Sequence, residues 1–141
     1  MSVYADSSLF VALYLPEIHS GEALRRTSQR KRIWLTPLHR VEWNHAIAQH
    51  VFRQVISAGE AARVYSAFEA NRKSNFWVEA SIPDAAYERA AELARLHGPQ
   101  MRIRTLDTLH IASALELGAK EFWTFDQRQE RLAKAVGIST S

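Results

Sequence analysis

The sequence predicts a single α/β domain whose mostly parallel sheet is covered by helices on both faces. The first observation is that short apolar segments alternate along the chain with longer segments of helical character. The second is that two of the short segments, in "SVYADSSLF" and "EFWTFDQRQ", end on an aspartate and run directly into a helical stretch. Strands that alternate with helices in this way are typical of parallel sheets built from β–α–β units.

The composition sets limits on size, compartment and chemistry. The chain has 141 residues, of which 47% are hydrophobic. This is enough for one domain with a core, spanning 1–141, and too little for two. The chain has no cysteine, which excludes disulfides, thiol nucleophiles and cysteine-based zinc sites and fits a reducing, cytoplasmic setting. We find no signal peptide and no apolar run near the ~20 residues of a membrane span, so we expect no membrane association. The net charge of +3 modestly favours a polyanionic partner.

In the N-terminal half, the pattern predicts two strands and three helices. We expect a strand at 3–5, helices at 8–14 and 18–30, a strand at 33–36 and a long helix after it. Thr36 is the expected N-cap of that long helix and Pro37 its first residue, and Gly59 is expected to end it. Its apolar stripe is expected to comprise Leu38, Val41, Ala48, Phe52 and Val55 or Ile56.

The C-terminal half continues the alternation. The expected elements are a helix at 60–71, a strand at 76–79, helices at 84–97 and 105–118, a strand at 121–125 and a helix at 127–135. Pro83 opens the first of the two middle helices, and Gly98–Pro99 closes it, whereas Gly118 ends the second. The tryptophans of the strands, Trp34, Trp77 and Trp123, are expected in the core, and Trp43 is expected at the surface or in an interface.

Four acidic residues can meet at one edge of such a sheet. Asp6 and Asp126 follow strands, Glu42 lies about two turns into the long helix, and Asp107 lies in the first turn of its own helix. Ligand sites of parallel sheets gather at the carboxyl ends of the strands. If the strands are neighbours, all four carboxylates therefore come close together.

The helix that carries Asp107 is apolar on nearly every side, which predicts that it is buried. Its apolar residues are Leu106, Leu109, Ile111, Ala114, Leu115 and Leu117. A buried, unpaired carboxylate is costly unless a cation lies beside it. A set of oxygen ligands suits Mg²⁺ or Mn²⁺, ions that activate a water and bind the oxygens of a phosphodiester.

Other interpretations of the same residues are open at this point. Asp6, Asp126 and Asp107 are also suitable helix caps, and Glu42 alone is more often a surface acid. Paired histidines serve as acid and base in metal-independent ribonucleases. The spacings Glu42-x-x-His45 and Asp107-x-x-His110 match those of di-iron helix bundles, but the apolar strands disfavour a bundle. Both histidines are therefore interpreted as supporting or packing residues.

Three stretches of the chain resemble a known family: "YADSSLFVALYLPE", "TPLHRVEWNHA" and "RTLDTLHIASALELGAKEFWTFDQRQERLAKAVGI". They resemble the PIN-domain ribonucleases, and most closely the VapC-type toxins of toxin–antitoxin pairs. The resemblance implies an α/β/α sandwich with a five-stranded parallel sheet. It also implies RNA cleavage that depends on Mg²⁺ or Mn²⁺, a small antitoxin partner and a homodimer. A catalytically silent module that binds RNA or protein is the alternative function.

The resemblance also assigns the site. It implies that the acidic cluster that binds the metal and performs catalysis consists of Asp6, Glu42, Asp107 and Asp126. Ser7 and Thr124 are expected to support it, with Thr124 and Asp126 on one face of their strand, and Arg102 and Arg104 are expected to contact RNA. Many relatives carry a further acid two residues after the last aspartate, where this chain has Arg128.

Overall fold

The computed structural model describes residues 2–29 and 31–140 and contains a five-stranded, all-parallel sheet in the order β3-β2-β1-β4-β5. The strands are β1 (Ser2–Ala5), β2 (Arg32–Leu35), β3 (Val78–Glu79), β4 (Glu121–Trp123) and β5 (Ser139–Thr140). The helices are α1 (Ser7–Tyr14), α2 (Ser20–Thr27), α3 (Pro37–Phe52), α4 (Ala58–Lys73), α5 (Asp84–His97), α6 (Thr105–Glu116) and α7 (Gln127–Ala135). The predicted fold class is therefore confirmed.

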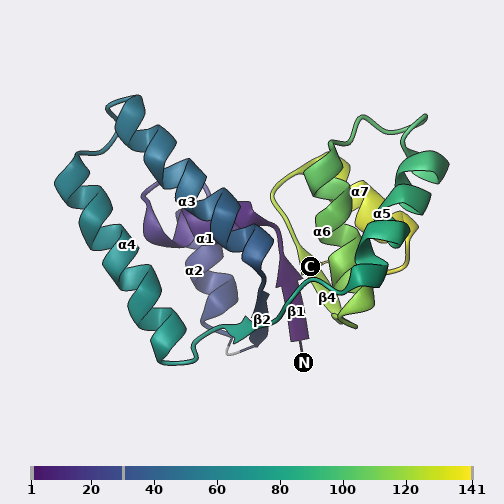
Figure 1. Ribbon diagram of the computed structural model, residues 1–141, viewed down its shortest axis with the longest axis horizontal. Helices are drawn as coiled ribbons and strands as arrows, with labels where there is room; N and C mark the ends of the chain where they lie inside the picture. The colour runs from purple at the N-terminus through teal and green to yellow at the C-terminus, as the bar shows by residue number, and fades with distance from the viewer. Residues whose placement is uncertain (1, 30, 141) are drawn as a thin grey trace.

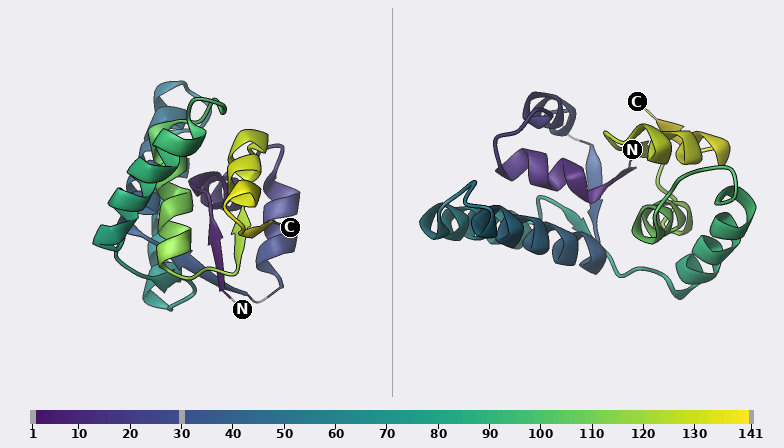
Figure 2. Two further views of the ribbon diagram at one scale, coloured as in Figure 1. Left: turned by 90° about the vertical axis from the view of Figure 1, so that its right-hand side faces the viewer. Right: turned by 90° about the horizontal axis from the view of Figure 1, so that it is seen from above.

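The sheet separates two hydrophobic cores, because successive side chains of a strand point to opposite faces. Val3 and Ala5 belong to the core with residues of α1, α3 and α4, whereas Tyr4, between them, belongs to the core with residues of α5, α6 and α7. Figures 1 and 2 show α1–α4 on one side of the strands and α5–α7 on the other. In the part of the chain that the structure describes, no helix combines the length and hydrophobicity that crossing a membrane requires.

The register of the central strands brings their carboxyl ends to one edge of the sheet. Ala5, the last residue of β1, lies opposite Trp123, the last residue of β4. The backbone N–H of Asp6 then donates to the carbonyl oxygen of Trp123 at 2.8 Å, which extends the pairing by one residue. As a result, the loops that follow β1 and β4 start side by side.

The buried face of α3 differs from the predicted stripe. Its buried residues are His39, Trp43 and Ile47, whereas Val41 and Phe52 are 67% and 80% exposed. The prediction was wrong because it counted only apolar residues along the helix, while the buried face is a narrow one with a spacing of four that begins at a histidine, His39. Trp43, expected near the surface, is buried and stacks on Phe68 with ring centroids 4.1 Å apart.

Several element boundaries also differ from the predictions. Helix α3 ends at Phe52, before Gln54 with its φ of 61°, and Gly59 lies in the first turn of α4 instead of ending α3. The helix expected at 18–30 is shorter, and residue 30 lies outside the described residues.

Two strands are shorter than predicted as well. The strand expected at 76–79 is reduced to β3, and β4 ends at Trp123. The chain turns after β4 because the Thr124 hydroxyl accepts a hydrogen bond from the backbone N–H of Asp126 at 3.0 Å. Thr124 and Asp126 therefore do not share a strand face.

Candidate active site

Asp6 and Asp126 both cap helices at the carboxyl edge of the sheet. Oδ2 of Asp6 accepts hydrogen bonds from the backbone N–H and the hydroxyl of Ser8, at 3.3 Å and 2.7 Å. Oδ1 of Asp126 accepts from the backbone N–H groups of Arg128 and Gln129, at 2.8 Å and 3.2 Å. The cap interpretation is therefore confirmed for these two aspartates, and it does not exclude a metal-binding role, because the capping bonds engage one oxygen of each carboxylate. For Asp107 it is wrong, because Arg104 is the N-cap residue of α6 and no side chain among the described residues makes a capping bond there.

Helix α3 is attached to the end of β1 through His39, a fully buried residue. Its Nδ1 accepts a hydrogen bond from the backbone N–H of Thr36 at 2.9 Å, so the ring proton lies on Nε2, which donates to the Ala5 carbonyl at 2.7 Å. This pair of bonds places Glu42, one turn further along α3, close to Asp6.

Glu42 is held by buried partners. It accepts a hydrogen bond from the Ser7 hydroxyl at 2.7 Å and another from Nε2 of His110. The other ring nitrogen of His110 lies 2.7 Å from the hydroxyl of Tyr4, and both residues are fully buried. Burial alone would raise the pKa of Glu42, but the bonds from His110 and Ser7 outweigh it and hold that pKa below its ordinary value. Burial raises the pKa of Tyr4, so its hydroxyl stays neutral.

Asp107 lies in a different environment. Its side chain is 16% exposed and pairs with Nε of Arg104 at 3.2 Å, while the Arg104 side chain is 84% exposed. Burial raises the pKa of Asp107, the pairing with Arg104 opposes that rise, and the charges of Asp6 and Asp126 add to it. Asp107 thus carries the cost of burial that was expected for a carboxylate on this apolar helix, and the like charge of Asp6 and Asp126 adds to it.

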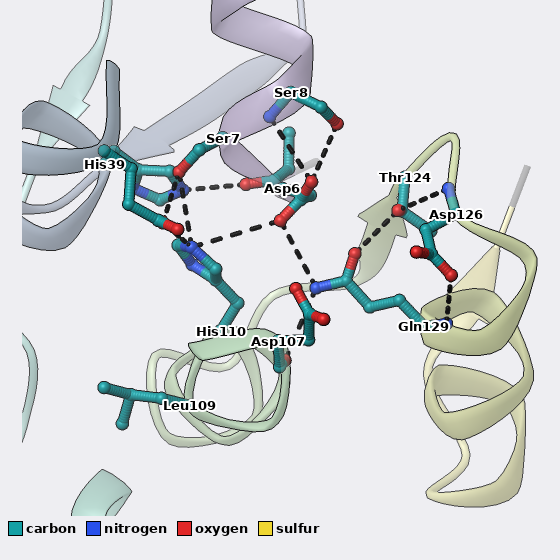
Figure 3. A network of polar contacts seen from close by, with 12 residues as sticks. Asp6, Ser7, Ser8, His39, Asp107, Leu109, His110, Thr124, Asp126 and Gln129 are labelled. Carbon is teal, nitrogen blue, oxygen red and sulfur yellow. Dashed lines mark hydrogen bonds and ion pairs between the residues drawn. The ribbon is translucent and has the colours of Figure 1, made fainter. Parts of the chain in front are cut away.

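Gln129 is a contact residue that the sequence did not reveal. It is fully buried, and its side-chain amide donates to Oδ1 of Asp6 at 3.3 Å and to the backbone oxygen of Asp107 at 3.4 Å. Figure 3 shows this amide between Asp6 and Thr124, with its nitrogen bonded to the Asp6 carboxylate and its oxygen to the Thr124 hydroxyl. A glutamine three residues after a helix-capping aspartate carried no signal, because polar side chains in the first turn of a helix usually face solvent.

The remaining predicted residues divide into two groups. Ser7 and Thr124 contact the site, through Glu42 and Gln129 respectively. Arg102 is exposed, and its carbonyl oxygen accepts a hydrogen bond from Arg128. His45 is exposed on α3, so its interpretation as a supporting or packing residue is wrong. The same interpretation is confirmed for His110, which is buried and bonded to Glu42. The parallel sheet also excludes the helix-bundle interpretation.

The carboxylate oxygens of the four acids are suitable ligands for a hard divalent cation, but they are not arranged as a complete metal-binding cage. Within residues 2–29 and 31–140, no three His, Asp or Glu side chains form a ready-made metal cluster. A pocket of about 300 Å³ is lined by Glu42, Asp107 and the first turn of α6 together with Arg104. Mg²⁺ needs no complete protein cage, since it usually binds through one or two carboxylates, waters and substrate phosphates.

Comparison with known proteins identifies the family. The family model of the PIN domain matches residues 3–135. The chain belongs to the PIN-domain family. A relative, Ribonuclease VapC46 of Mycobacterium tuberculosis, is 30% identical over 140 residues, which are 98% of this chain and 95% of that protein.

Solved structures agree with this PIN-domain fold. The sarcin–ricin loop cleaving toxin VapC20 of M. tuberculosis superimposes with a TM-score of 0.70 at 17% identity, over 96% of this chain and 95% of that chain. VapBC2 of Rickettsia felis, solved with a DNA fragment from its promoter, gives a TM-score of 0.70 at 11% identity, over 100% of this chain and 98% of that chain. At such identities the likeness establishes the shared fold.

Proposed function

We propose that this PIN-domain protein is a metal-dependent endoribonuclease and the toxin of a toxin–antitoxin pair. The observation that carries the proposal is the set of four acids around the carboxyl ends of β1 and β4, in a chain 30% identical to a named ribonuclease over nearly its whole length. Asp6, Glu42, Asp107 and Asp126 are the residues that would hold Mg²⁺ or Mn²⁺. When bound, the ion supplies an activated water and neutralises charge on the phosphodiester.

The protein's own residues supply orientation and charge. Glu42 is kept ionised and fixed in direction by His110 and Ser7. Arg104 lies at the edge of the pocket with an exposed side chain, where its guanidinium could pair with a phosphate of the RNA. Exposed Arg102 extends this basic edge along the approach of the RNA backbone.

Cleavage of RNA with defined metal additions tests the enzymatic part of the proposal. The purified protein should cut RNA in Mg²⁺ or Mn²⁺ and stop in EDTA, and re-addition of the ion should restore cleavage. Full activity in EDTA would contradict the metal-dependent site and favour a mechanism in which paired histidines act as acid and base. RNA binding without cleavage under every metal condition would favour the silent binding module.

The proposed partner is a small antitoxin protein, and the proposed location is the cytoplasm. The support is the relationship to VapC proteins, one of which is solved as a VapBC complex. Co-expression with the product of the adjacent small reading frame should abolish both toxicity and RNA cleavage. Unchanged toxicity and cleavage would contradict the assignment. The homodimer stays a prediction, to be tested by light scattering of the purified protein.

A further inference from the structure

The first turn of α7 is capped differently from the first turns of α3 and α4. In α3 and α4, the third helical residue returns its side chain to the backbone N–H of the N-cap residue, which closes a reciprocal capping box. Gln129 is the third residue of α7 and has a suitable side chain for the same role. However, the N–H of the N-cap residue Asp126 is taken by the Thr124 hydroxyl at 3.0 Å. The Gln129 amide is thereby released from capping.

The direction of the released amide is determined by Thr124. Because the Thr124 oxygen accepts from Asp126, its proton is available, and it donates to Oε1 of Gln129 at 2.6 Å. With its oxygen bound in this way, the amide presents Nε2 to Oδ1 of Asp6 at 3.3 Å and to the backbone oxygen of Asp107 at 3.4 Å. Both amide protons therefore have acceptors, and the side chain is fully buried.

These bonds join three segments that are distant in sequence: the end of β1, the first turn of α6 and the first turn of α7. Gln129, which makes these bonds, is neutral. An acidic residue would be favoured in the first turn of a helix, since the amino end of a helix attracts negative charge. A glutamate there would add another carboxylate beside Asp6, whose charge already raises the pKa of Asp107.

We propose that Gln129 is a positioning residue that holds Asp6 and the start of α6 together without adding charge to the acidic cluster. The proposal rests on the proposed function, because Gln129 would set the distance between the groups that bind the ion. Thr124 acts through Gln129 by orienting its amide. Loss of the amide should therefore weaken metal binding more than it lowers the stability of the metal-free protein.

The test measures metal binding without RNA. Urea unfolding in EDTA and over a Mg²⁺ or Mn²⁺ series gives the metal concentration at half-maximal stabilisation for each variant. Gln129→Met retains length and removes the hydrogen bonds, and we expect that concentration to rise about 10-fold or more, the range found when partners of metal ligands are lost. Gln129→Glu should lower stability in EDTA by adding like charge. Gln127→Met, at the exposed first position of α7, is the matched control and should match the wild type.

Thr124→Val provides a second approach in case Gln129→Met does not fold. It should raise the same metal concentration, and the double variant should add little, because both changes remove one linked arrangement. A wild-type metal response in Gln129→Met or in Thr124→Val, even with lower stability in EDTA, would overturn the proposal. A wild-type protein that responds to metal but cuts no RNA would instead contradict the proposed function and leave the role of Gln129 standing.

Discussion

The Glu42 carboxylate is held by buried partners, whereas the Asp107 carboxylate is paired with an arginine that is largely in solvent. His110, fully buried, and the Ser7 hydroxyl both donate to Glu42. Asp107 has Arg104, which is 84% exposed and three residues away on the same segment. Burial acts to raise the pKa of both carboxyls. In Glu42 the bonds from His110 and Ser7 outweigh burial and leave the pKa lowered, whereas in Asp107 the pairing with Arg104 does not and the pKa stays raised.

In the proposed metal site, this difference would give the two carboxylates different roles. A ligand held by buried hydrogen bonds keeps its charge and direction whether or not an ion is present. A ligand paired with an exposed cation can exchange that cation for a metal at little cost, because exposed ion pairs contribute only about 0–1 kcal/mol. We expect Glu42 to supply geometry and Asp107 to supply most of the response to metal.

Neutralising the two carboxylates gives the largest expected effect. Asp107→Asn and Glu42→Gln should each reduce RNA cleavage by more than about 100-fold, since losing a ligand should exceed the ~10–100-fold cost of losing a ligand's partner. Their stabilities in EDTA should differ in direction. Asp107→Asn should equal or exceed the wild type in urea unfolding, whereas Glu42→Gln should be less stable. Equal shifts in both variants would remove the distinction between the two carboxylates.

Removal of His110 should weaken the buried side of the site. His110→Leu leaves Glu42 and the Tyr4 hydroxyl without this partner, so we expect a destabilisation of about 1–3 kcal/mol and a loss of cleavage of about 10–100-fold. Urea unfolding and initial cleavage rates measure the two effects. His45→Leu is the matched control, because His45 has the same spacing from Glu42 that His110 has from Asp107 but is exposed. A normal rate in His110→Leu would show that Glu42 needs no fixed direction.

Replacement of Arg104 should have a smaller effect with two opposite components. In Arg104→Ala, the metal no longer competes with the guanidinium, so half-maximal stabilisation should need up to about fivefold less Mg²⁺, as expected for an exposed ion pair. The KM for RNA should rise because a phosphate contact is lost. Arg102→Ala should raise the KM without changing the metal response. A weaker metal response in Arg104→Ala would mean that the arginine assists the ion and does not compete with it.

The pH dependence of stability in EDTA should show the smallest effect, with opposite signs for the two carboxylates. A raised folded-state pKa makes the charged form of Asp107 unfavourable, so the stability gained by Asp107→Asn should be present at neutral pH and disappear as the pH falls below the ordinary aspartate value of about 3.9. The lowered pKa of Glu42 stabilises the fold above the ordinary glutamate value of about 4.3. That contribution is lost as the pH falls through the folded-state pKa.

Urea unfolding of the wild type and both variants between about pH 7 and pH 3 measures these two trends. The difference between wild type and Asp107→Asn should shrink toward low pH, and so should the opposite difference between wild type and Glu42→Gln. Parallel curves for all three proteins would contradict both pKa directions.

Local signals in the sequence determined much of the framework. Thr36 and Pro37 begin α3 as predicted, and α7 has the predicted bounds. Asp6 and Asp126 follow strands and cap helices as their positions indicated. These features depend on residues within one or two turns of each other, where dihedral preferences and capping bonds decide the structure.

Only the tertiary structure decided how the acids are held. His110 meets Tyr4 across 106 positions and Glu42 across 68, and Gln129 meets Asp6 across 123. The buried face of α3 likewise depends on which helices cover it. Such pairings follow from the order of the strands, which brings β1 between β2 and β4. Periodicity within a segment carries no information about the neighbours of that segment in the sheet. It therefore cannot predict which residues lower the pKa of Glu42, or that the pKa of Asp107 stays raised.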